Sequence, residues 1–96
     1  MAHVRISVEA EEDIDRIAAY TRDTWGWRQT DQYLAKLEDG FNLLAQNPSI
    51  GRSSDSIHPG LRRFEIGLHV VFHLSEPGGI LVVRVLHERM LPSNYT

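Results

Sequence analysis

Residues 61–87 read LRRFEIGLHVVFHLSEPGGILVVRVLH, and this stretch decides the fold. Apolar side chains recur there at every second position, which is the period of a β-strand. Gly67 and the run Pro77-Gly78-Gly79 divide the stretch at residue types that favour turns. The predicted strands are 61–66, 68–75 and 80–87. Connections this short join antiparallel neighbours, so we expect an antiparallel sheet.

The turn at Pro77 and Gly78 predicts the register of the last hairpin: His73 faces Val82, Val71 faces Arg84 and His69 faces Leu86. Directly paired residues share a face of the sheet. The apolar face, which we expect to lie under helices, carries Val70, Phe72, Leu74, Leu81, Val83 and Val85 and ends at His87. The half-polar face, which we expect to be open, carries His69, Val71, His73, Val82, Arg84 and Leu86. The turn at Gly67 is too ambiguous to place Arg63 and Glu65 on either face.

Upstream of this sheet, a short strand over 3–8 and a first helix are predicted. Ser7 is a residue type that caps helices, and the acidic residues that follow it suit the positive end of a helix. Gly26 is expected to end the helix. Its predicted buried stripe consists of Ala10, Ile14, Ile17, Ala18, Thr21 and Trp25.

A second helix is predicted from about Trp27 to Gln46, where Pro48 stops it. Its buried stripe is Thr30, Leu34, Leu37, Phe41 and Leu44, at steps of three and four. Gly40 lies inside this helix, either as a tolerated defect or because another backbone approaches closely. Two helices with so short a connection form an antiparallel hairpin. The segment 47–60 is rich in Pro, Gly and Ser and is predicted to be a loop, with room for a short helical turn.

The predicted architecture is therefore a single α+β domain over residues 1–96, with element order β-α-α-β-β-β. A helical hairpin packs on a mostly antiparallel sheet. The chain has no cysteine, no apolar run long enough to cross a membrane and no long apolar stretch near the N-terminus. We therefore expect a cytoplasmic protein without disulfides and without a membrane partner.

The charge distribution favours a protein partner. Residues 1–48 carry five basic and nine acidic side chains, whereas residues 49–96 carry five arginines and four acidic side chains. A general nucleic-acid binder shows a marked basic excess, which this chain lacks. We expect no direct binding to nucleic acid.

Three histidines near one sheet raise the questions of metal binding and catalysis. His69 and His73 are four residues apart on one strand, so their Cα atoms are about 13 Å apart. That separation, with His87 expected on the other face, argues against a shared metal ion. No cofactor is expected, because phosphate-binding loops and nucleophile motifs are missing. RNA cleavage stays open as a catalytic function, with acid, base and cation drawn from Arg63, His69, Arg84, His87, Glu88 and Arg89.

Three ordered segments resemble the ParE toxins of the ParE/RelE superfamily. The first runs from Trp25-Gly26 to Leu44-Ala45-Gln46-Asn47-Pro48-Ser49-Ile50-Gly51-Arg52. The second is Gly60-Leu61-Arg62-Arg63-Phe64 followed by Gly67-Leu68-His69-Val70-Val71-Phe72. The third is Arg84-Val85-Leu86-His87-Glu88-Arg89-Met90. His73 and Leu91 depart from the pattern, since Tyr and Asp are frequent there.

The resemblance implies the RelE/ParE-like fold and a toxin of a type II toxin–antitoxin system. Such toxins mostly poison DNA gyrase without enzymatic chemistry, and a ParD-type antitoxin neutralises them. The alternatives are a ribosome-dependent mRNA endonuclease of the RelE type and an inert relative that only forms complexes. Leu91 lies in the region linked to toxicity, which leaves target and potency open.

Two sets of surface residues follow from these expectations. The predicted toxic surface consists of Arg62, Arg63, His69, Arg84, His87, Arg89 and Met90. The predicted antitoxin-binding residues are the acidic Glu11, Glu12 and Asp15 and the apolar or aromatic Tyr20, Trp27, Tyr33 and Leu43.

Overall fold

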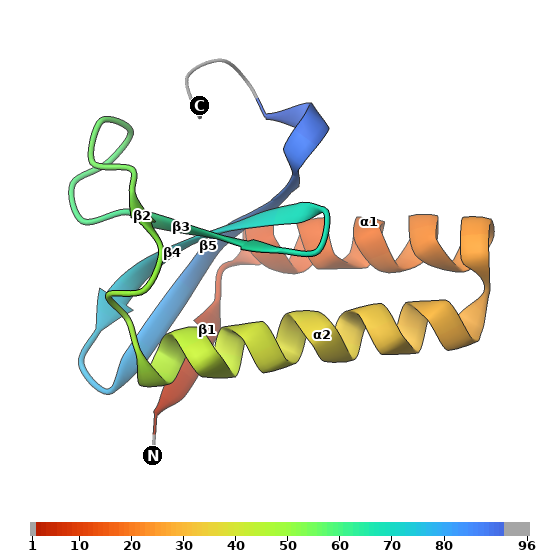
Figure 1. Cartoon of the computed structure of the whole chain (residues 1–96), viewed down its shortest axis with the longest axis horizontal. Coiled ribbons are helices and arrows are strands. Elements are labelled where there is room, and N and C mark those ends of the chain that lie inside the picture. Colours follow the sequence, from red (N-terminus) through yellow and green to blue (C-terminus); the bar gives the residue numbers. More distant parts are fainter. Residues whose placement is uncertain (1, 92–96) are drawn as a thin grey trace.

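The computed structural model describes residues 2–91 and has the expected α+β architecture (Figure 1). The strands are β1 (His3–Ile6), β2 (Arg52–Ser53), β3 (Arg62–Ile66), β4 (His69–Glu76) and β5 (Gly79–His87). The helices are α1 (Val8–Trp25), α2 (Trp27–Gln46) and a 3-10 turn, η1 (Glu88–Met90). The second helix has the bounds that its apolar stripe predicts.

The sheet has five strands in the order β1-β5-β4-β3-β2. β1 runs parallel to β5, and the remaining neighbours are antiparallel. β2 was missing from the predicted order because its two residues are too few to show a period. It pairs Arg52 with Arg63 and Ser53 with Arg62, and so covers part of the outer edge of β3.

The register of the β4–β5 hairpin is confirmed near its turn and wrong farther along. His73 pairs with Val82 as predicted, but an irregularity between Phe72 and His73 shifts the later pairs by one. The observed pairs are Phe72 with Arg84, Val71 with Val85, Val70 with Leu86 and His69 with His87. A β-bulge has this effect, because one extra residue on one strand reverses the faces that follow.

The prediction of which face lies under the helices is also wrong. Both helices pack with Val71, Ile80 and Val82 in the main core, and Val85, which was predicted to lie under the helices, is also there. Val70 and Phe72 lie on the opposite face, where they form a second core with Leu61. The loop residue Ile57, the strand residues Leu74, Val83 and Leu86, and Leu91 pack around it. Each face of the sheet is apolar, so hydrophobicity alone does not identify the face that the helices cover.

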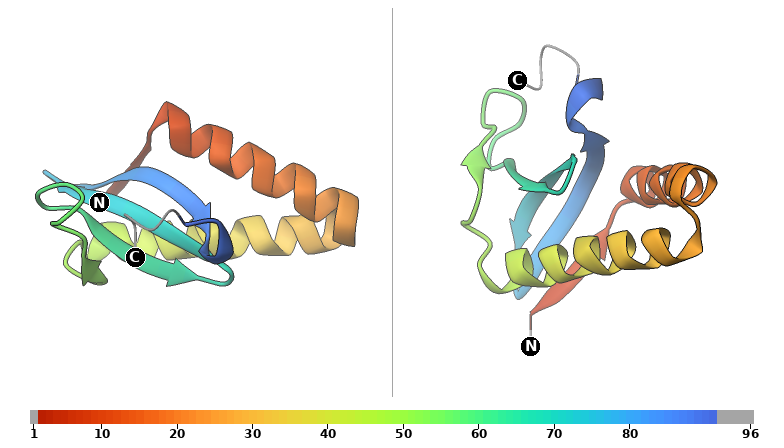
Figure 2. Two further views of the ribbon diagram at one scale, coloured as in Figure 1. Left: turned by 90° about the horizontal axis from the view of Figure 1, so that it is seen from above. Right: turned by 45° about the vertical axis from the view of Figure 1, so that its right-hand side comes forward.

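The first helix starts at the predicted cap. The Ser7 hydroxyl accepts a hydrogen bond from the Ala10 amide (3.0 Å) and donates one to the Val83 carbonyl (2.7 Å). The cap therefore joins the start of α1 to β5. At the other end, Trp25 was expected to be buried but is 69% exposed. Trp25 is exposed because the two helices meet at Gly26 in a turn that lies well away from the strands (Figures 1 and 2).

Gly40 lies where another part of the chain approaches α2 closely. The approaching group is a side chain, whereas the sequence analysis considered a backbone. A Cβ atom at this position would lie 2.2 Å from Cδ1 of Ile66 and 3.0 Å from its Cγ1. Ile66 is buried at the end of β3. The missing side chain thus lets α2 lie directly on β3.

Candidate functional site

One end of the sheet brings together residues from four elements. His69 begins β4, His87 ends β5, and the two are directly paired. Their ring centroids are 5.3 Å apart and the rings are nearly perpendicular, at 82°. The expectation that His87 lies on a different face from His69 is therefore wrong, and the bulge in β5 is the reason.

Tyr33 of α2 contacts this histidine pair from the helical layer. Its hydroxyl lies 2.5 Å from Nδ1 of His69 and accepts a hydrogen bond from the Leu68 amide (3.2 Å). The Ile66 carbonyl is 3.3 Å away. Gly67 between them has φ +59°, and a Cβ there would lie 2.7 Å from the Tyr33 hydroxyl. Glycine is thus required both by the turn and by the approach of Tyr33.

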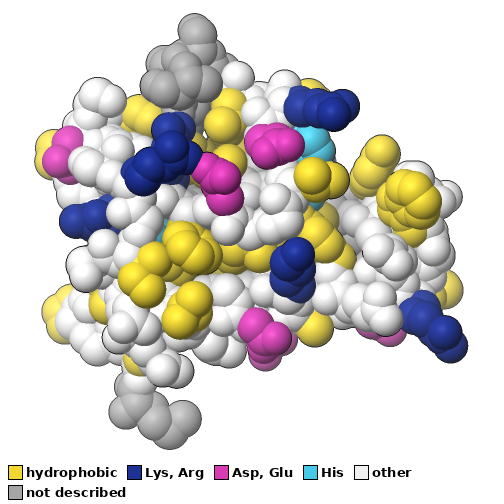
Figure 3. Space-filling model, viewed as in Figure 1, with side chains coloured by type: hydrophobic (Ala, Val, Ile, Leu, Met, Phe, Trp, Pro, Cys, Tyr) yellow, Lys and Arg dark blue, Asp and Glu magenta, His cyan; other side chains and the backbone are white. Residues whose placement is uncertain are grey.

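The C-terminal turn η1 is fixed to the same end of the sheet. Nδ1 of His87 accepts a hydrogen bond from the Arg89 amide (3.0 Å), and the Glu88 amide donates to the Leu68 carbonyl (3.0 Å). Leu68 and Met90 are 57% and 76% exposed, and Arg89 is also exposed. We call Leu68, His69, His87, Arg89 and Met90 the sheet-end surface. Figure 3 shows histidine, basic and hydrophobic side chains side by side at this end of the molecule.

The protonation states limit the chemistry of this surface. Burial, and next the charge of His87, lower the pKa of His69 from 6.5 to about 4. His69 is therefore neutral at physiological pH. Because Nδ1 of His87 accepts from an amide, the neutral form of that ring carries its proton on Nε2. The neutral His69 ring offers hydrogen bonds and apolar contacts to a partner.

The predicted toxic residues do not all lie together. Arg62 and Arg63 begin β3, whereas the sheet-end surface lies beyond its other end. Arg62 pairs with His73 and donates to the Gly51 carbonyl (3.0 Å). His73, one of the two departures from the family pattern, is fully buried, and burial and Arg62 lower its pKa. These residues support the loop over 47–60 and do not extend the sheet-end surface.

Arg84 is bound to the helical layer. It was predicted to lie on the open face, opposite the helices and opposite Phe72. It pairs with Phe72 next to the irregularity in the hairpin, and its side chain reaches α1. Its guanidinium donates two hydrogen bonds to Asp13 of α1, at 2.7 and 2.9 Å. The Asp13 carboxylate also accepts from the Val85 amide (3.0 Å) and from Arg16 (2.7 Å). Arg84 therefore joins α1 to β5.

Asp13 belongs to the acidic residues that were predicted to suit the N-terminal end of the first helix, and it is only 4% exposed. Burial alone would raise the pKa of Asp13, but the bonds from Arg84, the Val85 amide and Arg16 outweigh burial and lower it. Its spacing in the sequence indicates this burial. Asp13 follows Ala10 by three residues and precedes Ile17 by four, which places it on the buried stripe of α1.

The predicted antitoxin-binding residues lie on both helices but do not form one patch. Glu11, Glu12 and Asp15 are exposed on α1. Tyr20 and Trp27 are 68% and 67% exposed, and the Arg22 guanidinium lies 5.3 Å from the centre of the Trp27 ring. Leu43, 46% exposed, lies near the far end of α2. Tyr33 belongs to the sheet end, as described above.

A groove that the sequence did not reveal runs between the two helices and β1. Its volume is about 280 Å³. The residues that line it are Ile6, Ile14, Leu34, Leu37, Glu38 and Phe41. Its floor is apolar, and Glu38 adds a negative charge at the rim. An apolar groove between two helices suits the apolar side chains of another helix.

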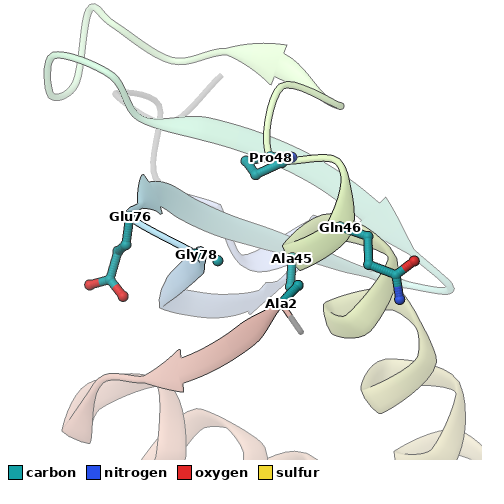
Figure 4. Close-up of a pocket in the computed structure, with 7 residues that line it drawn as sticks. Ala2, Ala45, Gln46, Pro48, Glu76 and Gly78 are labelled. Carbon is teal, nitrogen blue, oxygen red and sulfur yellow. The ribbon is translucent and has the colours of Figure 1, made fainter.

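A second hollow, of about 440 Å³, lies between the N-terminal residues, the end of α2 and the β4–β5 turn (Figure 4). Its walls are mainly Ala, Pro and Gly, and the side chains of Glu76 and Gln46 point away from it. Arg5 and His3 hold the Glu76 carboxylate and lower its pKa to about 2. Polar groups do not converge on this hollow as they do in a ligand site.

Within residues 2–91, no group of three or more His, Asp or Glu side chains is arranged to hold a metal ion. In the same part of the chain, neither helix combines the length and the apolar character needed to cross a bilayer.

Comparisons with known proteins agree with the fold. The family model described as "ParE toxin of type II toxin-antitoxin system, parDE" matches residues 4–92. "Toxin ParE1" of Mycobacterium tuberculosis is 42% identical over 86 residues, which is 88% of each chain. "Toxin ParE" of Escherichia coli is 41% identical over 86 residues, covering 88% of this chain and 84% of its own. A solved chain described as "Chromosomal ParDE TA system from P. aeruginosa" superposes with a TM-score of 0.75 at 19% identity, over 91% of this chain and 96% of its own.

Proposed function

Because the chain belongs to the ParE toxin family of type II toxin–antitoxin systems, we propose that it stops growth by binding DNA gyrase through its sheet-end surface. In this proposal a ParD-type antitoxin on the helical hairpin neutralises it. The observation that carries the target-binding role is the exposure of Leu68, Arg89 and Met90 around the paired rings of His69 and His87. Arginine and large apolar side chains are typical contact residues of protein interfaces.

The gyrase proposal is tested with the purified toxin in a supercoiling and DNA-cleavage assay. Arg89→Ala and Met90→Ala should each lower potency by about 30-fold if these residues are binding hot spots. Arg28→Ala, which changes an exposed arginine on α2, is the matched control and should stay within about threefold of the wild type. If both sheet-end variants keep full potency, the sheet-end surface does not contact gyrase.

The juxtaposition of His69 and His87 favours ribosome-dependent mRNA cleavage as the second candidate function. A ribosome-programmed RNA-cleavage assay, run beside the gyrase assay, separates the two. Loss of a general acid or base lowers a rate by roughly 10²- to 10⁴-fold. If the toxin cleaves mRNA and His69→Ala and His87→Ala each reduce the rate that far, catalysis replaces the contact mechanism. Inactivity in both assays would indicate a relative that only forms complexes.

The antitoxin proposal rests on the apolar groove and on the acidic side chains near it. We expect a segment of the antitoxin to lie along the hairpin with apolar side chains in the groove. A segment that folds on binding must bury roughly 1,000 Å² or more to offset its ordering. Basic residues of the antitoxin are expected to meet Glu11, Glu12, Asp15 and Glu38, and to speed encounter more than they strengthen binding.

Hydrogen exchange of the complex tests this arrangement. Amides of α1 and α2 along the groove should gain protection when the antitoxin is added. Glu38→Gln should lower the association rate in a salt-dependent manner, whereas Asp55→Asn, a change in the loop over 47–60, should leave it unchanged. Protection confined to that loop, with the hairpin unaffected, would disprove the hairpin as the docking site.

A further inference from the structure

We infer that Tyr33 is a positioning residue that couples the helical hairpin to the sheet-end surface. The inference rests on the proposed function, because it assigns a regulatory contact between the two proposed binding surfaces. Tyr33 was predicted to contact the antitoxin, and His69 and His87 were predicted to contact the target. The structure brings these three residues into one cluster.

The Tyr33 hydroxyl reaches both strands that flank Gly67. It lies 3.3 Å from the Ile66 carbonyl at the end of β3 and 2.5 Å from Nδ1 of His69 at the start of β4. It also accepts from the Leu68 amide in the turn itself (3.2 Å). One atom of α2 therefore contacts the ends of both strands and the turn that joins them.

The contact continues from the turn to the C-terminal residues. The Tyr33 and His69 rings are 5.4 Å apart between centroids, and the His69 and His87 rings are 5.3 Å apart. His87 holds the Arg89 amide, and the Leu68 carbonyl holds the Glu88 amide. A shift of Tyr33 would move both the turn that carries Leu68 and the turn that carries Arg89 and Met90.

Tyr33 is also adjacent to the groove in which we place the antitoxin. Leu34 is its chain neighbour and Leu37 follows one helical turn later, and both line the groove. A partner seated there contacts the same stretch of α2 that supports the sheet end. Binding on the hairpin can thus alter the geometry of the sheet-end surface without covering it, which is a coupling between two distinct sites.

The test is Tyr33→Phe, which removes the hydroxyl and keeps the ring. The matched control is Thr24→Val, which removes an exposed hydroxyl on α1. In Tyr33→Phe we expect the ¹⁵N resonance of His69 Nδ1 to move and the Leu68 and Arg89 amides to exchange faster. Potency in a growth-arrest assay should fall by about two- to thirty-fold, the range for residues that act through others. Antitoxin binding should change Arg89 exchange in the wild type, and this response should be lost in Tyr33→Phe. Thr24→Val should match the wild type in all four measurements.

His69→Gln alters the same contact from the side of the sheet and should also make the Leu68 and Arg89 amides exchange faster. It serves as the second variant if Tyr33→Phe folds poorly. Unchanged Leu68 and Arg89 exchange in both variants, or unchanged potency in Tyr33→Phe, would overturn the inference. The growth-arrest assay measures toxicity whichever target the protein binds. If the wild type fails to inhibit gyrase but Tyr33→Phe still weakens growth arrest, the gyrase proposal fails and the positioning role stands.

Discussion

Asp13→Asn should destabilise the protein by about 3 kcal/mol, the lower end of the range for breaking one side of a buried ion pair. The carboxylate is 3% exposed and binds Arg84, Arg16 and the Val85 amide. An amide of the same shape removes the charge and turns an N–H toward the Arg84 guanidinium. Because the Arg84 side chain is 32% exposed, water solvates it partly and keeps the loss at the lower end. For a domain of this size the melting temperature should fall by about 12 °C or more.

Chemical denaturation of Asp13→Asn and of Asp15→Asn gives the comparison. Asp15 is an exposed acid on the same helix, and its change should alter stability by less than about 0.5 kcal/mol. Equal unfolding midpoints for the two variants would show that the bond between α1 and β5 contributes little. A large loss only for Asp13 would also explain any loss of toxicity in Arg84 variants through folding, without a direct contact between Arg84 and the target.

Stability should fall by about 2 kcal/mol between pH 7.5 and pH 4, because of His69. Its pKa is 6.5 in the unfolded chain and about 4 in the folded one, so below pH 6.5 the unfolded chain binds a proton that the folded chain rejects. The stabilisation is therefore complete above pH 6.5 and is lost as the pH falls toward 4. The full shift corresponds to about 3 kcal/mol, which we reduce because His69 is only half-buried. His73, whose pKa is also lowered, adds to the loss in the same direction.

Unfolding curves at several pH values measure this effect. His69→Gln should flatten the dependence between pH 6.5 and 4 without abolishing it, since His73 is still present. His58→Gln, a change of an exposed histidine in the loop over 47–60, should leave the dependence as in the wild type. Further loss below pH 4 is expected as the Asp13 and Glu76 carboxylates take up protons, because the pKa of each is lowered in the folded state. A flat profile from pH 7.5 to 4 would contradict the burial of neutral His69.

The elements were predictable because their signals are local. The stripe from Thr30 to Leu44 defines α2, and Ser7 marks the start of α1. The turn at Pro77 and Gly78 gave the correct pairs up to His73 and Val82. Beyond that point one extra residue in β5 reverses the alternation, and nothing in the sequence Val82-Val83-Arg84-Val85 indicates it.

The candidate site was predictable only in part, because it depends on contacts between distant segments. His69, His87, Arg89 and Met90 were chosen from the sequence and do lie close together. Tyr33 was assigned to another surface, because its hydroxyl meets residues more than 30 positions away. Arg84 was assigned to the open face and the toxic surface, because its partner Asp13 lies 71 residues earlier within an acidic run. A charge pair of that separation leaves no periodic signal.

The parallel pairing of β1 with β5 has a consequence for the timing of synthesis. His3 pairs with Gly79 and Ile6 with Val82, so the first strand has no partner until the last strand has been made. Ribosomes add about 5 to 20 residues per second, so this chain takes roughly 5 to 20 seconds to complete. During that interval the sheet is open at β1 and the C-terminal turn does not yet exist. The surface that we propose for target binding is therefore completed only at the end of synthesis, whereas both helices of the hairpin have been made well before then.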